Sequence, residues 1–254
     1  MPGLPNIVSM QTMAGMAKPA SGWDIAGAIL LLLWAVAMWA AVAALWLANR
    51  GVVRPWLFRA SLTVIVIGVI GQIGHLTEHV AQVGYWFQHP NSPAWMTPWG
   101  TALARGFGRV DPTKPTLGME ILHLTGNFIF LAGIAGIMVI TRRARRTRTR
   151  FWAKMGVWMQ GLHGLEHLSL TLSVWFGASQ AIGLSTWFGQ LTPGPGLTTY
   201  RIWWHFTANV IGSVIFAIAL YHLWQERRVV RASFTGGEIE DGSTPELVEQ
   251  PQAA

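Results

Sequence analysis

Long apolar stretches dominate the 254-residue chain and alternate with short polar segments. Five of the stretches are long enough to cross about 30 Å of hydrocarbon as helices that rise about 1.5 Å per residue. The pattern predicts an all-α integral membrane protein with five transmembrane helices. The stretches cover Trp23 to Ala48, Ala60 to Phe87, Leu117 to Ile140, Trp152 to Phe176 and Ile202 to Trp224.

The polar positions inside these stretches follow a pattern that occurs twice. Gln-x-x-His-x-x-Glu-His in the second and fourth stretches is followed by His-x-Thr-x-Asn in the third and fifth. The pattern predicts two parallel two-helix repeats, at about residues 60–140 and 152–226, related by a pseudo-twofold axis along the membrane normal. The first stretch has no counterpart and is expected at the periphery. The motif residues are Gln72, His75, Glu78, His79, His123, Thr125 and Asn127 in the first copy, and Gln160, His163, Glu166, His167, His205, Thr207 and Asn209 in the second.

Spacing predicts which side chains cooperate. Residues three, four and seven positions apart share one face of a helix, so each copy presents two imidazoles one turn apart beside a carboxylate. Glu120 adds a Glu-x-x-His pair with His123, whereas the fifth stretch has Ile202 at that place. Any bound centre should therefore be asymmetric. Counted from the basic residues Arg59 and Arg150, both copies are expected in the outer half of the bilayer.

Ionisable groups are costly in hydrocarbon, so a duplicated polar arrangement predicts a site. Imidazole suits Zn, Cu, Fe and Ni, and carboxylates favour iron or manganese over Cu(I). The candidates exceed the needs of one ion, so we expect two iron or copper ions, one per repeat, with amide side chains orienting the imidazoles. The expected ligands are His75, Glu78, His79, Glu120, His123, His163, Glu166, His167 and His205, and the expected amides are Gln72, Asn127, Gln160 and Asn209.

The leading hypothesis is a metal-dependent membrane oxidoreductase or oxygenase that acts on a small apolar or lipophilic substrate, or that passes electrons. One alternative is binding or transport of Cu, Zn or Fe without catalysis, although the apolar inner halves of the third and fifth stretches disfavour a polar path. Another is a subunit that binds b-type haem or a pigment in a larger complex. A structural alternative is that these polar residues only form hydrogen bonds between helices and so hold the bundle together. His-x-x-Glu-His also matches the motif of inverted zinc peptidases, but over five residues only, so no assignment follows from it.

Composition and charge predict that the protein lies in a membrane, and in which orientation. The chain is 52% hydrophobic and 11% charged, which excludes an ordinary soluble domain. Most basic residues lie before Ala60, between the third and fourth stretches, and after the fifth. The positive-inside rule therefore predicts a multi-pass protein of the cell membrane with its N-terminus outside and its C-terminus cytoplasmic. The basic loop has a topological role in this interpretation and binds no nucleic acid.

Outside the membrane domain, expected at residues 23–231, two terminal segments remain. Residues 1–22 are expected outside the cell, and Met10, Met13 and Met16 in them offer soft ligands for copper. Residues 232–254 are acidic and are predicted to be a disordered cytoplasmic tail. The chain has no cysteine, which excludes disulfides and thiolate metal sites. Expected partners are membrane lipids and other membrane subunits or an electron donor.

Overall fold

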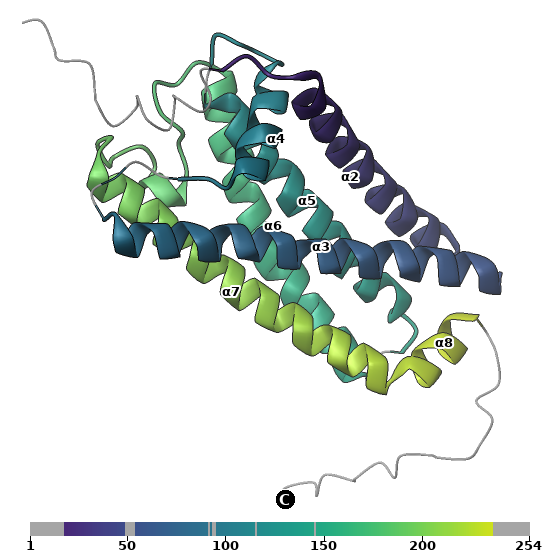
Figure 1. The fold of residues 1–254 in the computed structure, drawn as a ribbon. Coiled ribbons are helices and arrows are strands. Elements are labelled where there is room, and N and C mark those ends of the chain that lie inside the picture. Colours follow the sequence, from purple (N-terminus) through teal and green to yellow (C-terminus); the bar gives the residue numbers. More distant parts are fainter. Residues whose placement is uncertain are drawn as a thin grey trace, which may run out of the picture.

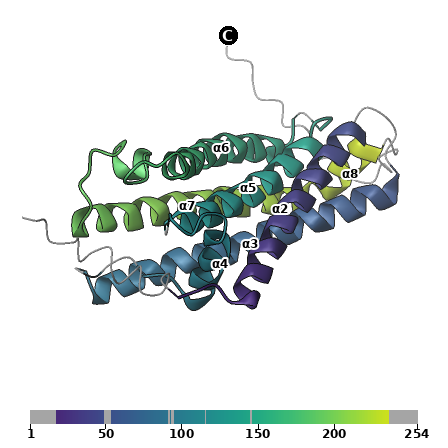
Figure 2. The ribbon, with the colours of Figure 1, turned by 90° about the horizontal axis from the view of Figure 1, so that it is seen from above.

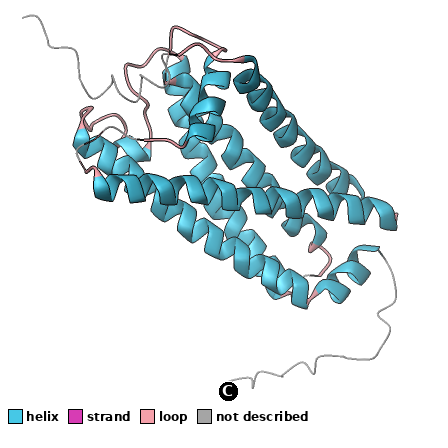
Figure 3. Ribbon diagram, viewed as in Figure 1, coloured by secondary structure: helices cyan, strands magenta, loops and turns pink. Residues whose placement is uncertain are grey.

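The computed structural model describes residues 18–48, 54–90, 92, 95–114, 116–144 and 146–235. All regular structure in these ranges is helical (Figure 3). The methionines at 10, 13 and 16 and the acidic tail beyond Thr235 lie outside the described residues. The elements are α2 (Gly22–Ala48), α3 (Pro55–Gln88), α4 (Pro98–Gly108), α5 (Leu117–Ile140), α6 (Arg148–Trp175), the short 3-10 helix η1 (Leu184–Thr186), α7 (Pro195–Gln225) and α8 (Arg227–Thr235).

Four helices in the described ranges, α2, α3, α5 and α7, are long and apolar enough to cross a membrane. The prediction of an all-helical chain with several membrane-spanning helices is confirmed to that extent. The 28-residue α6 is equally long but less apolar, because it begins with Arg148, Arg150 and Lys154 and carries a polar motif in its middle. The fifth span therefore stays a prediction.

The helices of the two sequence repeats form one bundle. α3 packs against α5 and α7, and α6 packs against the same two helices. Figure 2 shows α3 and α6 on opposite sides with α5 and α7 between them. α2 lies along α5 and α3 and also contacts α4 (Figure 1). We call the end with α4 and η1 the loop end, and the end with α8 and the turn between α5 and α6 the basic end.

Two segments outside the five predicted stretches are partly helical. α4 lies within residues 88–116, and α7 begins at Pro195 rather than after Arg201. Proline fits the first turn of a helix, where its missing N–H is not needed. The Thr97 side chain also accepts a hydrogen bond from the N–H of Gly100 at 3.2 Å and caps α4. In both segments, proline marks where a helix begins.

The basic end is closed by α8, which extends four residues into the segment predicted as a disordered tail. Phe234 is fully buried, and its ring centre lies 5.2 Å from that of Phe58 on α3. Glu226, directly before α8, accepts hydrogen bonds from the N–H groups of Arg148 at 2.9 Å and Thr149 at 3.0 Å. An anion at the start of α6 is favourable because the helix dipole is positive there. Apolar contact and this carboxylate therefore hold the basic end together.

Small residues let the helices approach closely. A Cβ added to Gly136 of α5 would lie 2.4 Å from Cδ1 of Ile65 on α3, and one added to Gly133 would lie 2.9 Å from Cγ2 of Val69. At such distances the neighbouring side chain would have to move to make room for a Cβ. Helices in membranes associate through this kind of tight packing, because lipid supplies no hydrophobic drive between them. The α3–α5 contact therefore depends on glycine.

We expect Gly136→Val to destabilise the bundle by about 1 to 3 kcal/mol, because the added methyl groups must displace Ile65. Thermal unfolding in detergent measures the effect. Gly74→Ala on α3 is the matched control, since a Cβ there meets nothing within 4 Å. Equal stability of the two variants would contradict the proposed packing.

Candidate metal centre

Six histidines from four helices lie together inside the bundle. His75 and His79 come from α3, His123 from α5, His163 and His167 from α6, and His205 from α7. Neighbouring ring centres are 4.7 to 6.1 Å apart. We call these six residues the histidine cluster. The duplicated motif thus brings its imidazoles into a single group.

The ring contacts come in pairs of similar geometry. One ring pair on α3 and one on α6 are each edge-on, and two pairs that join different helices are nearly parallel. His123 and His205 meet between the halves, with ring centres 6.0 Å apart. The matched pairs are His75–His79 at 4.7 Å and 90° with His163–His167 at 4.8 Å and 87°, and His79–His205 at 5.9 Å and 9° with His123–His167 at 5.5 Å and 7°.

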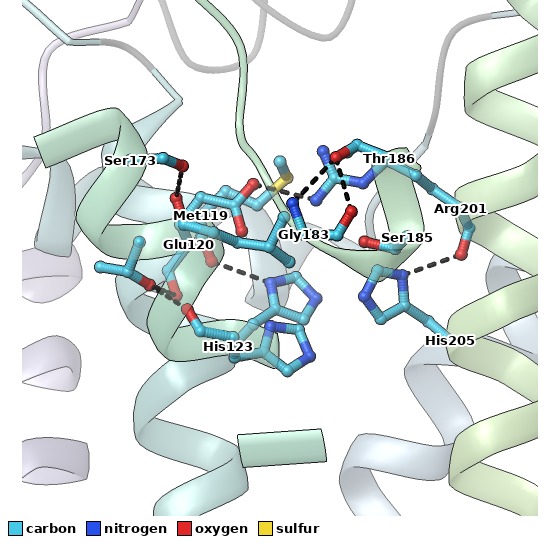
Figure 4. A network of polar contacts seen from close by, with 12 residues as sticks. Met119, Glu120, His123, Ser173, Gly183, Ser185, Thr186, Arg201 and His205 are labelled. Carbon is cyan, nitrogen blue, oxygen red and sulfur yellow. Dashed lines mark hydrogen bonds and ion pairs between the residues drawn. The ribbon is translucent and has the colours of Figure 1, made fainter. Parts of the chain in front are cut away.

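Three of the imidazoles are held through Nδ1. Nδ1 of His123 lies 2.8 Å from the carbonyl oxygen of Met119, and Nδ1 of His205 lies 2.8 Å from that of Arg201 (Figure 4). A carbonyl oxygen only accepts, so Nδ1 must carry the proton in both rings. Nδ1 of His79 lies 3.0 Å from Oε1 of Gln82, which favours the same tautomer. Each ring therefore keeps the lone pair on Nε2, as metal-bound histidines do.

Several imidazole nitrogens in the described chain are buried without a hydrogen-bond partner. They are Nε2 of His163, both nitrogens of His167 and Nε2 of His205. Nε2 of His79, in contrast, has a partner, because it accepts a hydrogen bond from Nε2 of His75 at 3.2 Å when its Nδ1 donates to Gln82. An unsatisfied buried polar atom costs about 1 to 3 kcal/mol. The cluster therefore contains several imidazole nitrogens that have no hydrogen-bond partner.

Within the described ranges, no three of these side chains are arranged to hold a single ion. Two imidazoles that share an ion at about 2.0 to 2.1 Å have ring centres about 4.5 to 5.5 Å apart for bond angles near 90° to 120°. The shortest separations, 4.7 and 4.8 Å, fall within that range. Five separations, of 5.9 to 6.1 Å, exceed it. Shared coordination of one ion by three rings therefore requires side chains of the cluster to move.

Two of the predicted carboxylate ligands accept hydrogen bonds from backbone N–H groups at the loop end. Glu78 accepts hydrogen bonds from the N–H of Thr97 at 2.9 Å and from the Thr97 hydroxyl, at the start of α4. Glu166 accepts from the N–H groups of Leu184 at 2.6 Å and Ser185 at 2.7 Å, at the start of η1. Both are buried. These two carboxylates fasten the segments that cover the histidine cluster.

The third carboxylate joins α5 to α7. Oε1 of Glu120 lies 2.9 Å from Nη2 of Arg201, and its Oε2 is buried without a partner in the described structure. Figure 4 places this pair one turn toward the loop end from His123 and His205. The second repeat has Ile202 at the matching place, so this negative charge lies on one half only. Of the three carboxylates, Glu120 has an oxygen left for another partner.

The comparisons with known proteins give a family and no function. A family model described as a family of unknown function, DUF6008, matches residues 10–252. The chain is a member of the DUF6008 family. No curated protein and no solved structure matches it.

The amides of this DUF6008 protein bond the backbone beside the rings. Nδ2 of Asn127 donates to the carbonyl oxygen of His123 at 2.9 Å, and Nδ2 of Asn209 donates to that of His205 at 2.8 Å. Gln160 donates to Oδ1 of Asn127 at 2.6 Å. The side chain of Gln72 lies outside the described part. The amides thus fix the helical turns that carry the histidines, instead of orienting the rings directly as expected.

Three residues that support the site of this DUF6008 protein were not expected from the sequence. Gln82 holds His79 and lies three positions after it, outside the repeated motif. Arg201 pairs with Glu120 and was counted only as a basic residue of the outer loop. Thr97, directly before α4, donates a hydrogen bond to Glu78 through its backbone N–H. Gln82 could have been predicted, because residues three positions apart share one face of a helix. The sequence pattern gives no comparable indication for Arg201 or Thr97.

We expect Glu166→Gln to loosen the loop end of the DUF6008 protein. The two carboxylate oxygens serve different N–H groups, and an amide NH₂ accepts no hydrogen bond, so one N–H loses its acceptor. Hydrogen bonds to charged groups contribute about 1.5 to 3 kcal/mol, so amide exchange at Leu184 or Ser185 should rise about tenfold or more. Hydrogen–deuterium exchange measures this.

The matched control is Glu78→Gln, which should leave exchange at Leu184 and Ser185 unchanged, because Glu78 bonds only one backbone N–H, that of Thr97, and a glutamine oxygen can still accept from it. Unaltered exchange at both Leu184 and Ser185 in Glu166→Gln would show that the carboxylate does not hold this segment.

Proposed function

We propose that this DUF6008 protein is an integral membrane metalloprotein and that its histidine cluster holds two iron or copper ions. In this proposal it is a metal-dependent oxidoreductase or oxygenase that acts on a small apolar or lipophilic substrate. The cluster lies toward the loop end, which the distribution of basic residues assigns to the outer face.

The observation that carries the proposal is the convergence of six imidazoles, of which His163, His167 and His205 have a buried Nε2 without a hydrogen-bond partner in the described structure. Nδ1 of His123 and His205 is committed to backbone oxygens, so only Nε2 is left to bind. Six basic nitrogens in an apolar bundle need protons, waters or metal ions as partners. Imidazole with little competing thiolate or thioether suits iron, copper and zinc. A metal satisfies several lone pairs at once.

The matched ring pairs support one ion for each repeat. His75, His79 and His123 form one group of three rings, and His163, His167 and His205 form the other. The pseudo-twofold relation between repeats and a fifth span by α6 are part of this proposal. The two groups touch at three ring pairs, His123–His167 at 5.5 Å, His79–His205 at 5.9 Å and His123–His205 at 6.0 Å, so the two ions would be neighbours. Neighbouring redox ions suit the activation of O₂ or the passage of electrons.

The free oxygen of Glu120 supports redox iron or copper over zinc. A carboxylate offsets charge when an ion reaches a higher oxidation state in a low-dielectric site. In this proposal the oxidoreductase takes electrons from its substrate or from a partner in the membrane.

A second candidate is a static metal-binding protein without catalysis. Transport is disfavoured because apolar side chains fill the bundle between the cluster and the basic end. The rings of Phe130 and Phe216 stack there with their centres 3.7 Å apart. The buried residues on α5 include Ile134, Ile137 and Ile140. A haem is less favoured, because a macrocycle would have to separate rings that pack directly against one another.

The decisive experiment is metal analysis with an optical spectrum on protein purified in detergent. We expect about two iron or copper ions per chain in the wild type, no Soret band, and loss of metal in His75→Ala/His163→Ala. Turnover of apolar substrates with O₂ then separates catalysis from static binding.

The matched control is His89→Ala/His222→Ala, which removes the two histidines outside the cluster and should keep the metal. Size-exclusion profiles of both double variants check that each is folded. A folded wild type that takes up neither iron nor copper on reconstitution would overturn the proposal.

A further inference from the structure

The segment between α6 and α7 bridges these two helices at the loop end. It covers residues 177–189 and includes η1, and we call it the η1 segment. On α6, Glu166 accepts hydrogen bonds from the N–H groups of Leu184 and Ser185. On α7, the Tyr200 hydroxyl donates to the carbonyl oxygen of Leu184 at 3.5 Å. The η1 segment therefore spans the loop end of the second repeat.

Two rings of the histidine cluster lie beneath the η1 segment. His167 directly follows Glu166 on α6, and His205 lies five positions after Tyr200 on α7. Both rings are buried, and their centres are 5.1 Å apart. Figure 4 shows Ser185 on the loop-end side of His205. The Ser185 hydroxyl is itself buried without a partner in the described structure. The η1 segment thus covers this side of the cluster.

Hydrogen bonds, rather than a large apolar contact, hold the η1 segment in place. Besides the bonds to Glu166, Ser169 donates to the carbonyl oxygen of Ile182 at 2.7 Å, and Ser173 accepts from the N–H of Ile182 at 2.8 Å. Among its apolar residues, the small Ala181 is buried. A segment with few buried apolar contacts opens at a low cost in free energy. The large apolar side chains are all 38 to 60% exposed, namely Ile182, Leu184, Trp187 and Phe188.

The η1 segment begins and ends at glycines with positive φ. The φ angle is 90° at Gly177 and 79° at Gly189, in a region that glycine adopts without steric cost. Between them, the Thr186 hydroxyl donates to the carbonyl oxygen of Gly183 at 2.9 Å and accepts from the N–H of Gly189 at 3.2 Å. This is the arrangement of a compact segment between two hinge residues.

The cover at the loop end of the first repeat is anchored more firmly. Glu78 holds α4 through Thr97, and α4 also packs against α2 and α5. Arg105 of α4 forms an ion pair with Asp24 of α2 at 3.0 Å. A Cβ added to Gly106 would lie 2.1 Å from the carbonyl oxygen of Asp24, so the two helices are in close contact. The η1 segment contains no charged residue and so has no such ion pair.

We infer that the η1 segment is a lid, hinged at Gly177 and Gly189 and latched by Glu166, and that its opening gives access from the loop end to His167 and His205. Both nitrogens of His167 and Nε2 of His205 lack partners in the described structure, so opening exposes atoms that bind a ligand. That the entering ligand is the transition metal ion rests on the proposed function, whereas the opening of the lid does not.

The first test uses single cysteines, because the chain has none of its own. Ser185→Cys replaces a fully buried side chain, and Leu184→Cys replaces one that is 43% exposed. We expect a water-soluble maleimide to label Ser185→Cys at least tenfold more slowly than Leu184→Cys. Adding Glu166→Gln should raise the labelling rate of Ser185→Cys at least tenfold, because the latch is weakened.

The second test asks whether opening of the lid exposes the rings. Diethyl pyrocarbonate modifies neutral imidazole, and mass spectrometry measures the modification at each histidine. The full-length protein is first treated with a chelator, so that no metal shields the rings. We expect Glu166→Gln to raise the modification rate of His167 and His205 at least fivefold and to leave that of the exposed His89 unchanged.

Glu78→Gln is the matched control, because it changes the same side chain beneath the anchored helix α4. It should leave the maleimide labelling of Ser185→Cys and the modification of His167 and His205 unchanged. Unaltered labelling of Ser185→Cys in Glu166→Gln would show that the segment does not open. Faster labelling without faster modification of the two rings would place the entrance elsewhere. Either result overturns the inference.

Metal analysis of the same variants before chelation separates this inference from the proposed function. A lid response in protein that takes up neither iron nor copper supports the lid and overturns the metalloprotein proposal. Metal-loaded protein without a lid response overturns the lid and leaves the metalloprotein proposal standing.

Discussion

Imidazole rings buried in an apolar bundle need hydrogen-bond or metal partners, and the surroundings of the cluster are organised around that constraint. A polar atom without a partner in hydrocarbon costs several kcal/mol because no water replaces the lost hydrogen bonds. Here helix backbone satisfies Nδ1 of His123 and His205, and Gln82 faces Nδ1 of His79. Nε2 of His163, His167 and His205 has no partner in the described structure, and Nε2 is an atom that a metal can take.

The cluster keeps its shape because layers on both sides fix α5 and α7. Toward the loop end, Glu120 and Arg201 form an ion pair between the two helices. Toward the basic end, Phe130 and Phe216 stack. Three further carboxylates, Glu78, Glu166 and Glu226, each accept hydrogen bonds at the start of a helix. At the start of a helix a carboxylate is stabilised by the helix dipole and by hydrogen bonds from N–H groups that have no partner within the helix. Each of these three carboxylates therefore links two elements of the fold.

The helical architecture and the meeting of the six histidines could be predicted from the sequence, because apolar length predicts helices and a duplicated motif predicts a shared interface. The roles of Glu78 and Glu166 could not. Their spacing from the histidines suggested ligands, but a rotation of about 100° per residue turns a glutamate just before a histidine toward a different neighbour. That neighbour belongs to segments rich in proline and glycine, where pattern carries little information. α8 was missed because its apolar positions, such as Phe234, are sparse among arginines.

The central claim is that imidazole nitrogens of this cluster bind a transition metal. X-ray absorption at the metal edge of the purified, metal-loaded protein tests it most directly, because scattering beyond the first coordination sphere distinguishes imidazole from water or carboxylate. The account predicts nitrogen neighbours at about 2.0 to 2.1 Å with the outer-shell pattern of several imidazole rings. A metal surrounded by oxygen alone, without imidazole scattering, would contradict it.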